Sequence, residues 1–171
     1  MIYGGGTTLC VARHLAGKRS LKVITNAVPL LPELAALPDA EVYVAGGLLD
    51  LGFATILGDL AVDFLGRFDT AKAVLGMDGI SVRSGLSVTN SFVAATRRRM
   101  MAASAQLIVV SDRTKLDQVC LIQVAPLAEM AYLVTDDGAS PEIVKAIREC
   151  GPEVTTAKVE GGGERAPGAG M

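Results

Sequence analysis

The pattern that most constrains this chain is an alternation of short apolar runs, rich in β-branched residues, with longer segments of helical spacing. Continuous apolar runs are typical of parallel strands that are covered on both faces. The sequence therefore predicts an α/β domain with a mostly parallel twisted sheet and helices on both faces. Strands are expected at residues 2–3, 21–25, 41–45, 71–75, 106–110, 131–135 and 153–156.

The segments between these runs have apolar positions at helical spacing. Helices are expected at residues 7–16, 30–37, 57–68 and 92–101. In the helix at 57–68, the residues expected on the buried face are Leu57, Leu60, Phe64 and Phe68. A last helix is expected to begin at the N-cap Ser140, with Pro141 in its first turn, and to end at Gly151.

The length and composition fit one domain followed by a tail. The chain has 171 residues, of which 50% are hydrophobic and 20% charged, which excludes disorder of the whole chain. The last residues are rich in glycine and alanine and have no periodic apolar positions. We therefore expect one folded domain at residues 1–158 and a disordered tail at residues 159–171.

Charge and cysteine content exclude several classes of function. Sixteen Lys and Arg against 18 Asp and Glu give a net charge of −2, which argues against a strong nucleic-acid footprint on this chain. The three cysteines show no disulfide or zinc-ligand spacing. The chain has no apolar run of about 18 residues that would cross a membrane, and no secretory signal. We expect a cytoplasmic protein that binds a small molecule and needs no metal and no cofactor.

Glycine-rich and polar residues follow the carboxyl ends of the expected strands, where open α/β sheets bind ligands. The sharpest motif is Gly-Gly-Gly-Thr-Thr at residues 4–8. Consecutive glycines let the backbone approach a phosphate, and the N-terminus of the following helix supplies free N–H groups. The motif is neither GxGxxG nor a P-loop, so nothing favours a dinucleotide or a nucleoside triphosphate. The alternative is a tight turn capped by Thr7.

Three charged residues on the same rim are further candidates, each with an ordinary alternative. Lys115 follows the strand at 106–110 and is either a ligand-binding cation or a solvated surface charge. Asp78 either accepts hydrogen bonds from the hydroxyls of a polyol or forms an Asx-turn, and the turn is favoured when Asp78 is considered singly. Arg97, the first of three consecutive arginines, is either part of a solvated surface or a partner for an anion.

These motifs fall in the order and spacing of a known pattern, at residues 4–8, 25–26, 46–47, 76–80, 85–86 and 112–115. Their combination resembles the effector-binding domain of DeoR-type transcriptional regulators, over about residues 2–157. The resemblance implies a fold similar to that of ribose-5-phosphate isomerase and the CoA transferases. It also implies a non-catalytic sensor that binds a phosphorylated sugar or a related metabolite.

The predicted ligand-binding residues are Gly5, Gly6, Thr7, Thr8, Asn26, Asp78, Gly79, Arg97 and Lys115. The resemblance implies that residues 5–8 hold the phosphate, that residues 78–79 face the sugar, and that Lys115 binds an anion or a hydroxyl. The sequence departs from the family pattern at Gly4 and Val93, where acidic residues are common. Their loss indicates an altered ligand, weaker affinity or a degenerate pocket, because each unpaired hydroxyl forfeits about 1 kcal/mol.

Members of this family usually carry an N-terminal winged helix-turn-helix, and this chain begins inside what would be the first sensor strand. We therefore expect a fragment or a truncated gene product, with DNA binding assigned to the parent regulator. Two other functions stay open. A sugar-phosphate isomerase would use Asp78 and Lys115 but lacks the glutamate base that Val93 replaces. An oligomerisation module with a decayed pocket is the other, and the apolar content favours a homo-oligomer in any case.

Overall fold

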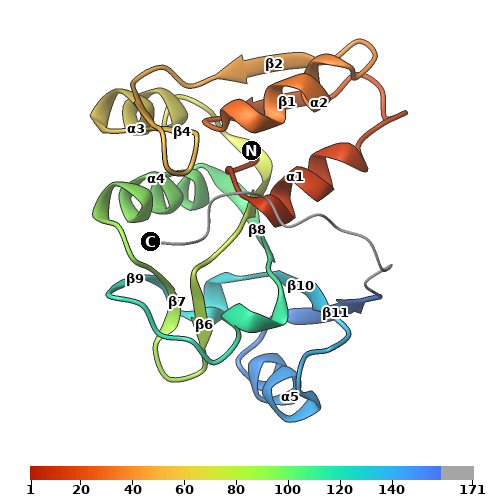
Figure 1. The fold of residues 1–171 in the computed structure, drawn as a ribbon, viewed down its shortest axis with the longest axis vertical. Helices are drawn as coiled ribbons and strands as arrows, with labels where there is room; N and C mark the ends of the chain where they lie inside the picture. The colour runs from red at the N-terminus through yellow and green to blue at the C-terminus, as the bar shows by residue number, and fades with distance from the viewer. Residues whose placement is uncertain (159–171) are drawn as a thin grey trace.

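A parallel sheet dominates the structure, a computed structural model that describes residues 1–158. Its strands are β1 (Lys22–Thr25), β2 (Glu41–Val44), β5 (Thr70–Leu75), β8 (Ser104–Val110), β10 (Tyr132–Asp136) and β11 (Glu153–Ala157). Ile2 joins β1 to β5 because it bridges Thr25 and Val74, both in parallel. The strand order is therefore β2, β1, Ile2, β5, β8, β10, β11, and it runs from the top to the lower part of Figure 1.

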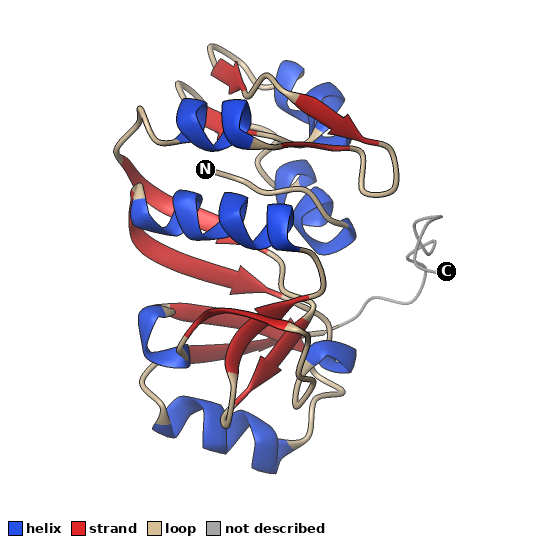
Figure 2. Cartoon of the chain, turned by 90° about the vertical axis from the view of Figure 1, so that its left-hand side faces the viewer, coloured by secondary structure: helices blue, strands red, loops and turns tan. Residues whose placement is uncertain are grey.

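Helices cover both faces of this sheet. The α-helices are α1 (Gly6–Arg13), α2 (Leu31–Ala35), α3 (Asp59–Leu65), α4 (Ser91–Ala102) and α5 (Pro141–Glu149). Neighbouring residues of a strand point to opposite faces. Val23 packs in one hydrophobic cluster, with residues of α1 and α2, and Ile24 packs in another, with residues of α3, α4 and α5. The predicted α/β architecture is therefore confirmed (Figure 2).

The long apolar runs gave accurate strand positions. Each of the six strands from β1 to β11 in the main sheet lies within two residues of its expected bounds. The last helix is also as expected, because Pro141 occupies its first turn and the Ser140 side chain accepts a hydrogen bond from the Ile143 N–H. The expected helix at 30–37 is shorter, since a 3₁₀ turn at Val28–Leu30 precedes α2.

The helix expected at 57–68 is wrong at its start. Leu57 ends the short strand β4 (Thr55–Leu57), and Gly58, with a φ of 91°, turns the chain before α3 begins at Asp59. Within α3 the buried residues are Ala61 and Leu65, whereas Leu60 is 73% exposed. The prediction of a buried Leu60 is therefore wrong.

Two small antiparallel units extend the fold beyond the predicted strands. β3 (Leu48–Asp50) forms a hairpin with β4, and β7 (Gly85–Val88) pairs with both β6 (Gly79–Ser81) and β9 (Ile122–Ala125). Gly85 has a φ of 71°, and a Cβ there would lie 2.3 Å from the Ala125 carbonyl oxygen. Only glycine fits this hairpin turn.

The predicted tail at residues 159–171 lies outside the described residues.

Candidate functional site

A cleft of about 510 Å³ lies at the carboxyl ends of the central strands. It is lined by residues 3–9 after the Ile2 bridge, 76–78 after β5, and 110–112 with Lys115 after β8. The hairpin residues 51–54 and Pro29, together with Val93 and Arg97 of α4, complete the lining. This volume suits a small molecule.

The structure brings most of the predicted site residues together. The cleft is lined by Gly5, Gly6, Thr7, Thr8, Asp78, Arg97 and Lys115, and also by Gly4 and Val93, the two positions that depart from the family pattern. Segments separated by more than 100 residues in the sequence, such as Gly5 and Lys115, therefore meet at one site.

The glycine loop presents the N-terminus of α1 to the cleft. The first helical hydrogen bond runs from the Leu9 N–H to the Gly5 carbonyl at 2.9 Å, so that helix geometry leaves the N–H groups of residues 6–8 without a helical acceptor. No side chain caps the helix, so Thr7 does not act as the cap that the alternative interpretation required. The buried Thr8 hydroxyl donates to the Gly5 carbonyl at 2.9 Å and shapes the loop. The helix end offers free donors and a partial positive charge.

The Lys115 side of the cleft is held by two carboxylates. Lys115 ends a 3₁₀ turn, Arg113–Lys115, whose N-cap Asp112 accepts from the Thr114 N–H at 2.8 Å. Asp136, at the end of β10, accepts from the Arg113 N–H at 2.6 Å and from its guanidinium Nη1 at 2.7 Å. Burial acts to raise the pKa of the Asp136 carboxyl, but the hydrogen bonds from Arg113 and the Gly138 N–H, together with the Arg113 charge, outweigh it and hold the pKa below its ordinary value.

The Asp136 anchor predicts an acid-sensitive contribution to stability. Because the folded-state pKa lies below 3.8, the ionised carboxylate stabilises the fold above about pH 4, and this contribution is lost as the pH falls through the folded-state pKa. We expect Asp136→Asn to lower the free energy of unfolding by about 1.5 kcal/mol at pH 7. Urea denaturation at pH 7 and pH 3 checks this, since the difference from wild type should shrink at pH 3. Asp137→Asn is the matched control, and an equal loss there would contradict the assignment to Asp136.

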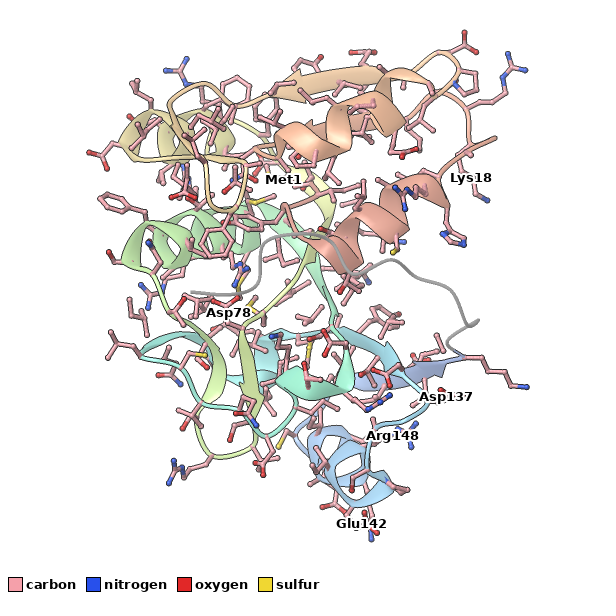
Figure 3. All side chains as sticks on the ribbon, in the orientation of Figure 1. Met1, Lys18, Asp78, Asp137, Glu142 and Arg148 are labelled. Carbon is pink, nitrogen blue, oxygen red and sulfur yellow. The ribbon has the colours of Figure 1, made fainter. Side chains whose placement is uncertain are left out.

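Arg97 and Asp78 form a pair in the wall of the cleft. Arg97 Nη1 lies 3.4 Å from Asp78 Oδ1, and the Arg97 side chain is only 7% exposed. Its guanidinium carbon lies 4.7 Å from the centroid of the Tyr3 ring, an arrangement that favours the cation. Burial raises the pKa of the Tyr3 phenol, an effect that the Arg97 charge opposes. Asp78 lies below α4 in Figure 3.

These contacts replace the ordinary interpretations of both residues. The second carboxylate oxygen of Asp78 accepts from the Thr89 N–H at 3.1 Å, eleven residues away, so Asp78 does not close an Asx-turn on its own loop. The two arginines after Arg97 also have defined partners. Arg98 donates to the Val124 carbonyl of β9, and Arg99 donates to the Gly66 carbonyl after α3. Arg98 and Arg99 are exposed, so the interpretation as a solvated surface holds for these two residues and not for the buried Arg97.

Asn26 and Gly79, the two remaining predicted residues, do not line the cleft. Asn26 is fully buried, and its Nδ2 donates to the Ile56 carbonyl at 3.0 Å, which fastens the end of β1 to β4. Gly79 begins β6, where a Cβ would lie 2.6 Å from both the Gln118 carbonyl and the Ser87 hydroxyl. Both residues hold neighbouring segments together.

Sequence reasoning missed several residues that line the cleft, among them Tyr3, Leu51 and Phe53. Tyr3 lies under the Arg97 guanidinium, while Leu51 and Phe53 come from the turn between β3 and β4. Leu51 is 85% exposed and Phe53 is 56% exposed. The sequence signal that could have identified Leu51 and Phe53 is that two large apolar residues flank Gly52 in a turn.

Residues 1–158 hold no cluster of three His, Cys, Asp or Glu side chains arranged to bind a metal ion. In the same part of the chain, no helix has the length and apolar character needed to cross a membrane.

Comparison with known proteins identifies the family. The family described as "DeoR C terminal sensor domain" matches residues 1–137. The transcriptional repressor AccR of Agrobacterium fabrum is 32% identical over 150 residues, which cover 87% of this chain and 58% of that protein. The regulator GlpR of Haloferax volcanii is 29% identical, over 88% of this chain and 58% of that protein. The repressor GlcR of Bacillus subtilis is 29% identical, over 76% and 50%.

This chain thus spans 50–58% of the length of these three relatives. The relatives are named as transcriptional regulators and repressors, which supports a non-catalytic, regulatory role for the domain. The family match covers the strands that carry the cleft, from the Ile2 bridge through β10. The chain belongs to the DeoR family of transcriptional regulators and contains their C-terminal sensor domain.

Proposed function

We propose that this domain is the ligand sensor of a cytoplasmic transcriptional regulator and binds a phosphorylated sugar or a related metabolite in the cleft. The ligand would change DNA binding by a helix-turn-helix outside this chain. The observation that carries the proposal is the meeting of the α1 N-terminus, Lys115 and Asp78 in one cleft of suitable volume.

Each part of the cleft has chemistry that suits one part of such a ligand. The free N–H groups at the start of α1 and its partial positive charge favour a phosphate. Lys115 adds a full positive charge on the opposite segment, after β8. Asp78 carries carboxylate oxygens that can accept hydrogen bonds from sugar hydroxyls, and the exposed Phe53 offers an apolar surface for the carbon skeleton.

The positions of the carboxylates argue against the isomerase alternative. Isomerisation of a sugar phosphate needs a base that is free to take a proton from carbon. Asp78 and Asp112 are the carboxylates among the residues that line the cleft. Asp78 is paired with Arg97, and Asp112 accepts the hydrogen bonds that cap its own 3₁₀ turn. Val93 supplies no base on α4.

Isothermal titration calorimetry with a panel of hexose and pentose phosphates tests the proposal. We expect saturable binding of at least one phosphate ester and no binding of the same sugar without its phosphate. Inorganic phosphate alone is expected to bind more weakly and to compete. A complete panel without saturable binding would refute the proposal.

We also propose that the domain self-associates through its β2 end, where β2 is the edge strand of the main sheet. Apolar side chains are exposed on this strand and on β3, which follows it: Tyr43, Val44, Leu48 and Leu49. Exposed edge strands with apolar side chains favour pairing with another chain. Sedimentation equilibrium should detect a dimer that Leu48→Glu weakens, and a monomer at all concentrations would refute the idea. Such an oligomer could couple ligand affinity to operator binding.

A further inference from the structure

We propose that the ligand carries a second anionic group, a carboxylate or a second phosphate, and that Arg97 binds it. This inference rests on the proposed function, which assigns the first phosphate to the α1 N-terminus and Lys115. It narrows the ligand class from sugar phosphates in general to those with two anionic groups.

The first observation is that Arg97 is buried but poorly paired. A guanidinium has five N–H donors. Among residues 1–158, the Arg97 side chain makes a single hydrogen bond, to Asp78 at 3.4 Å. Charge-assisted hydrogen bonds of this type are normally about 2.7–2.9 Å long. The Nε atom is buried without an acceptor. The guanidinium therefore lacks the acceptors that its burial requires.

The second observation is that the distance between Arg97 and Asp78 cannot easily shorten. The Asp78 carboxylate is held on its other oxygen by the N–H and hydroxyl of Thr89, at 3.1 and 3.4 Å. The Arg97 guanidinium is held against the ring of Tyr3, itself only 2% exposed. Thr89 holds the Asp78 carboxylate and Tyr3 packs against the Arg97 guanidinium, so an added acceptor would reach the guanidinium through the part of Arg97 that lines the cleft.

The third observation is that the neighbouring residues of the cleft wall offer no other hydrogen-bond acceptor to the Arg97 guanidinium. Val93, one helical turn before Arg97, is 3% exposed and apolar, and Met77 is 4% exposed. Asp112 is engaged with Thr114. A sugar hydroxyl would supply an acceptor but no charge, whereas an anionic oxygen would supply both. The apolar surroundings strengthen the interaction with a charged group, because the local dielectric is low.

Matched pairs of ligands test the inference directly. Glucose 6-phosphate and gluconate 6-phosphate differ in a carboxylate, and fructose 6-phosphate and fructose 1,6-bisphosphate differ in a second phosphate. We expect the member with two anionic groups to bind at least about tenfold more tightly in one or both pairs, as measured by calorimetry at fixed ionic strength. Equal affinities within both pairs would overturn the inference.

Substitutions assign the preference to Arg97. Arg97→Met should abolish the preference within each pair, because the member with two anionic groups loses more affinity than its monophosphate partner. Arg97→Lys keeps the charge without the planar fork and should keep part of the preference, so it serves as the test if the methionine variant does not fold. Lys115→Ala should weaken both members of a pair by a similar factor.

The outcomes separate this inference from the proposed function. Equal binding of the monophosphates and of the ligands with two anionic groups would refute the role of Arg97 and leave the proposed sensor function standing. A preference that persists in Arg97→Met would also refute that role. Failure of every phosphorylated ligand to bind would refute both.

Discussion

Replacing Lys115 with alanine is expected to weaken the binding of a sugar phosphate about 100-fold, which corresponds to about 2.7 kcal/mol. The loss is large because Lys115 lines the same cleft as the α1 N-terminus and would supply a full positive charge to the phosphate. A hydrogen bond to a charged group contributes about 1.5–3 kcal/mol. The fold should be unaffected, since Lys115 forms no ion pair among residues 1–158.

Calorimetric titration of the variant against the best ligand of the panel checks this expectation. Lys145→Ala is the matched control, because Lys145 lies on α5 and outside the cleft, with its side chain 78% exposed. Lys115→Arg keeps the charge and should retain most of the affinity. Wild-type affinity in Lys115→Ala would place the phosphate elsewhere.

The parts of the fold that the sequence predicts are those in which one physical signal dominates. The second halves of β5 and β8, residues 73–75 and 107–110, are continuous apolar runs of buried or half-buried side chains, as expected where both faces of a strand are covered. The carboxyl ends of parallel strands must meet at one edge. Gly5, Asp78 and Lys115 could therefore be assigned to one rim without knowledge of any contact between them.

The short antiparallel strands could not be predicted in the same way. β4 has three residues, too few to show an alternating pattern, and its apolar Leu57 fits a helix equally well. The hairpin it forms with β3 brings Leu51 and Phe53 to the cleft. Tertiary pairing with Asn26 fixes β4, and such pairing leaves no local signal in the sequence.

The same limit applies to individual site residues. Asn26 follows a strand, as a ligand-binding residue would, but its side-chain Nδ2 donates a hydrogen bond to the Ile56 carbonyl. Arg97 belongs to a run of three arginines, and only the packing of α4 shows that one enters the cleft while the next two bind carbonyl groups. Residue type and position predict the rim, whereas packing decides which side chains reach the ligand.

Gly4 gives the second large effect, because its surroundings leave no room for a side chain. A Cβ at this position would lie 2.4 Å from Thr55 Cγ2 and 2.9 Å from Ala27 Cβ. Both neighbours are fully buried, so neither can move aside cheaply. The acidic residue that the resemblance leads us to expect at this position would not fit this backbone. We expect Gly4→Ala to lower the free energy of unfolding by about 3 kcal/mol, measured by urea denaturation.

A double-mutant cycle with Thr55 separates this steric cost from any other effect of the added methyl group. Thr55→Ser removes the methyl group nearest to Gly4 and keeps the hydroxyl, so Gly4→Ala should cost less in that background. The remaining contact with Ala27 means that the rescue should be partial. Gly46→Ala is the control, because a Cβ there meets no atom within 4 Å and stability should not change. If Gly4→Ala were as stable as wild type, the packing of β4 against the glycine loop would not be what excludes the acid.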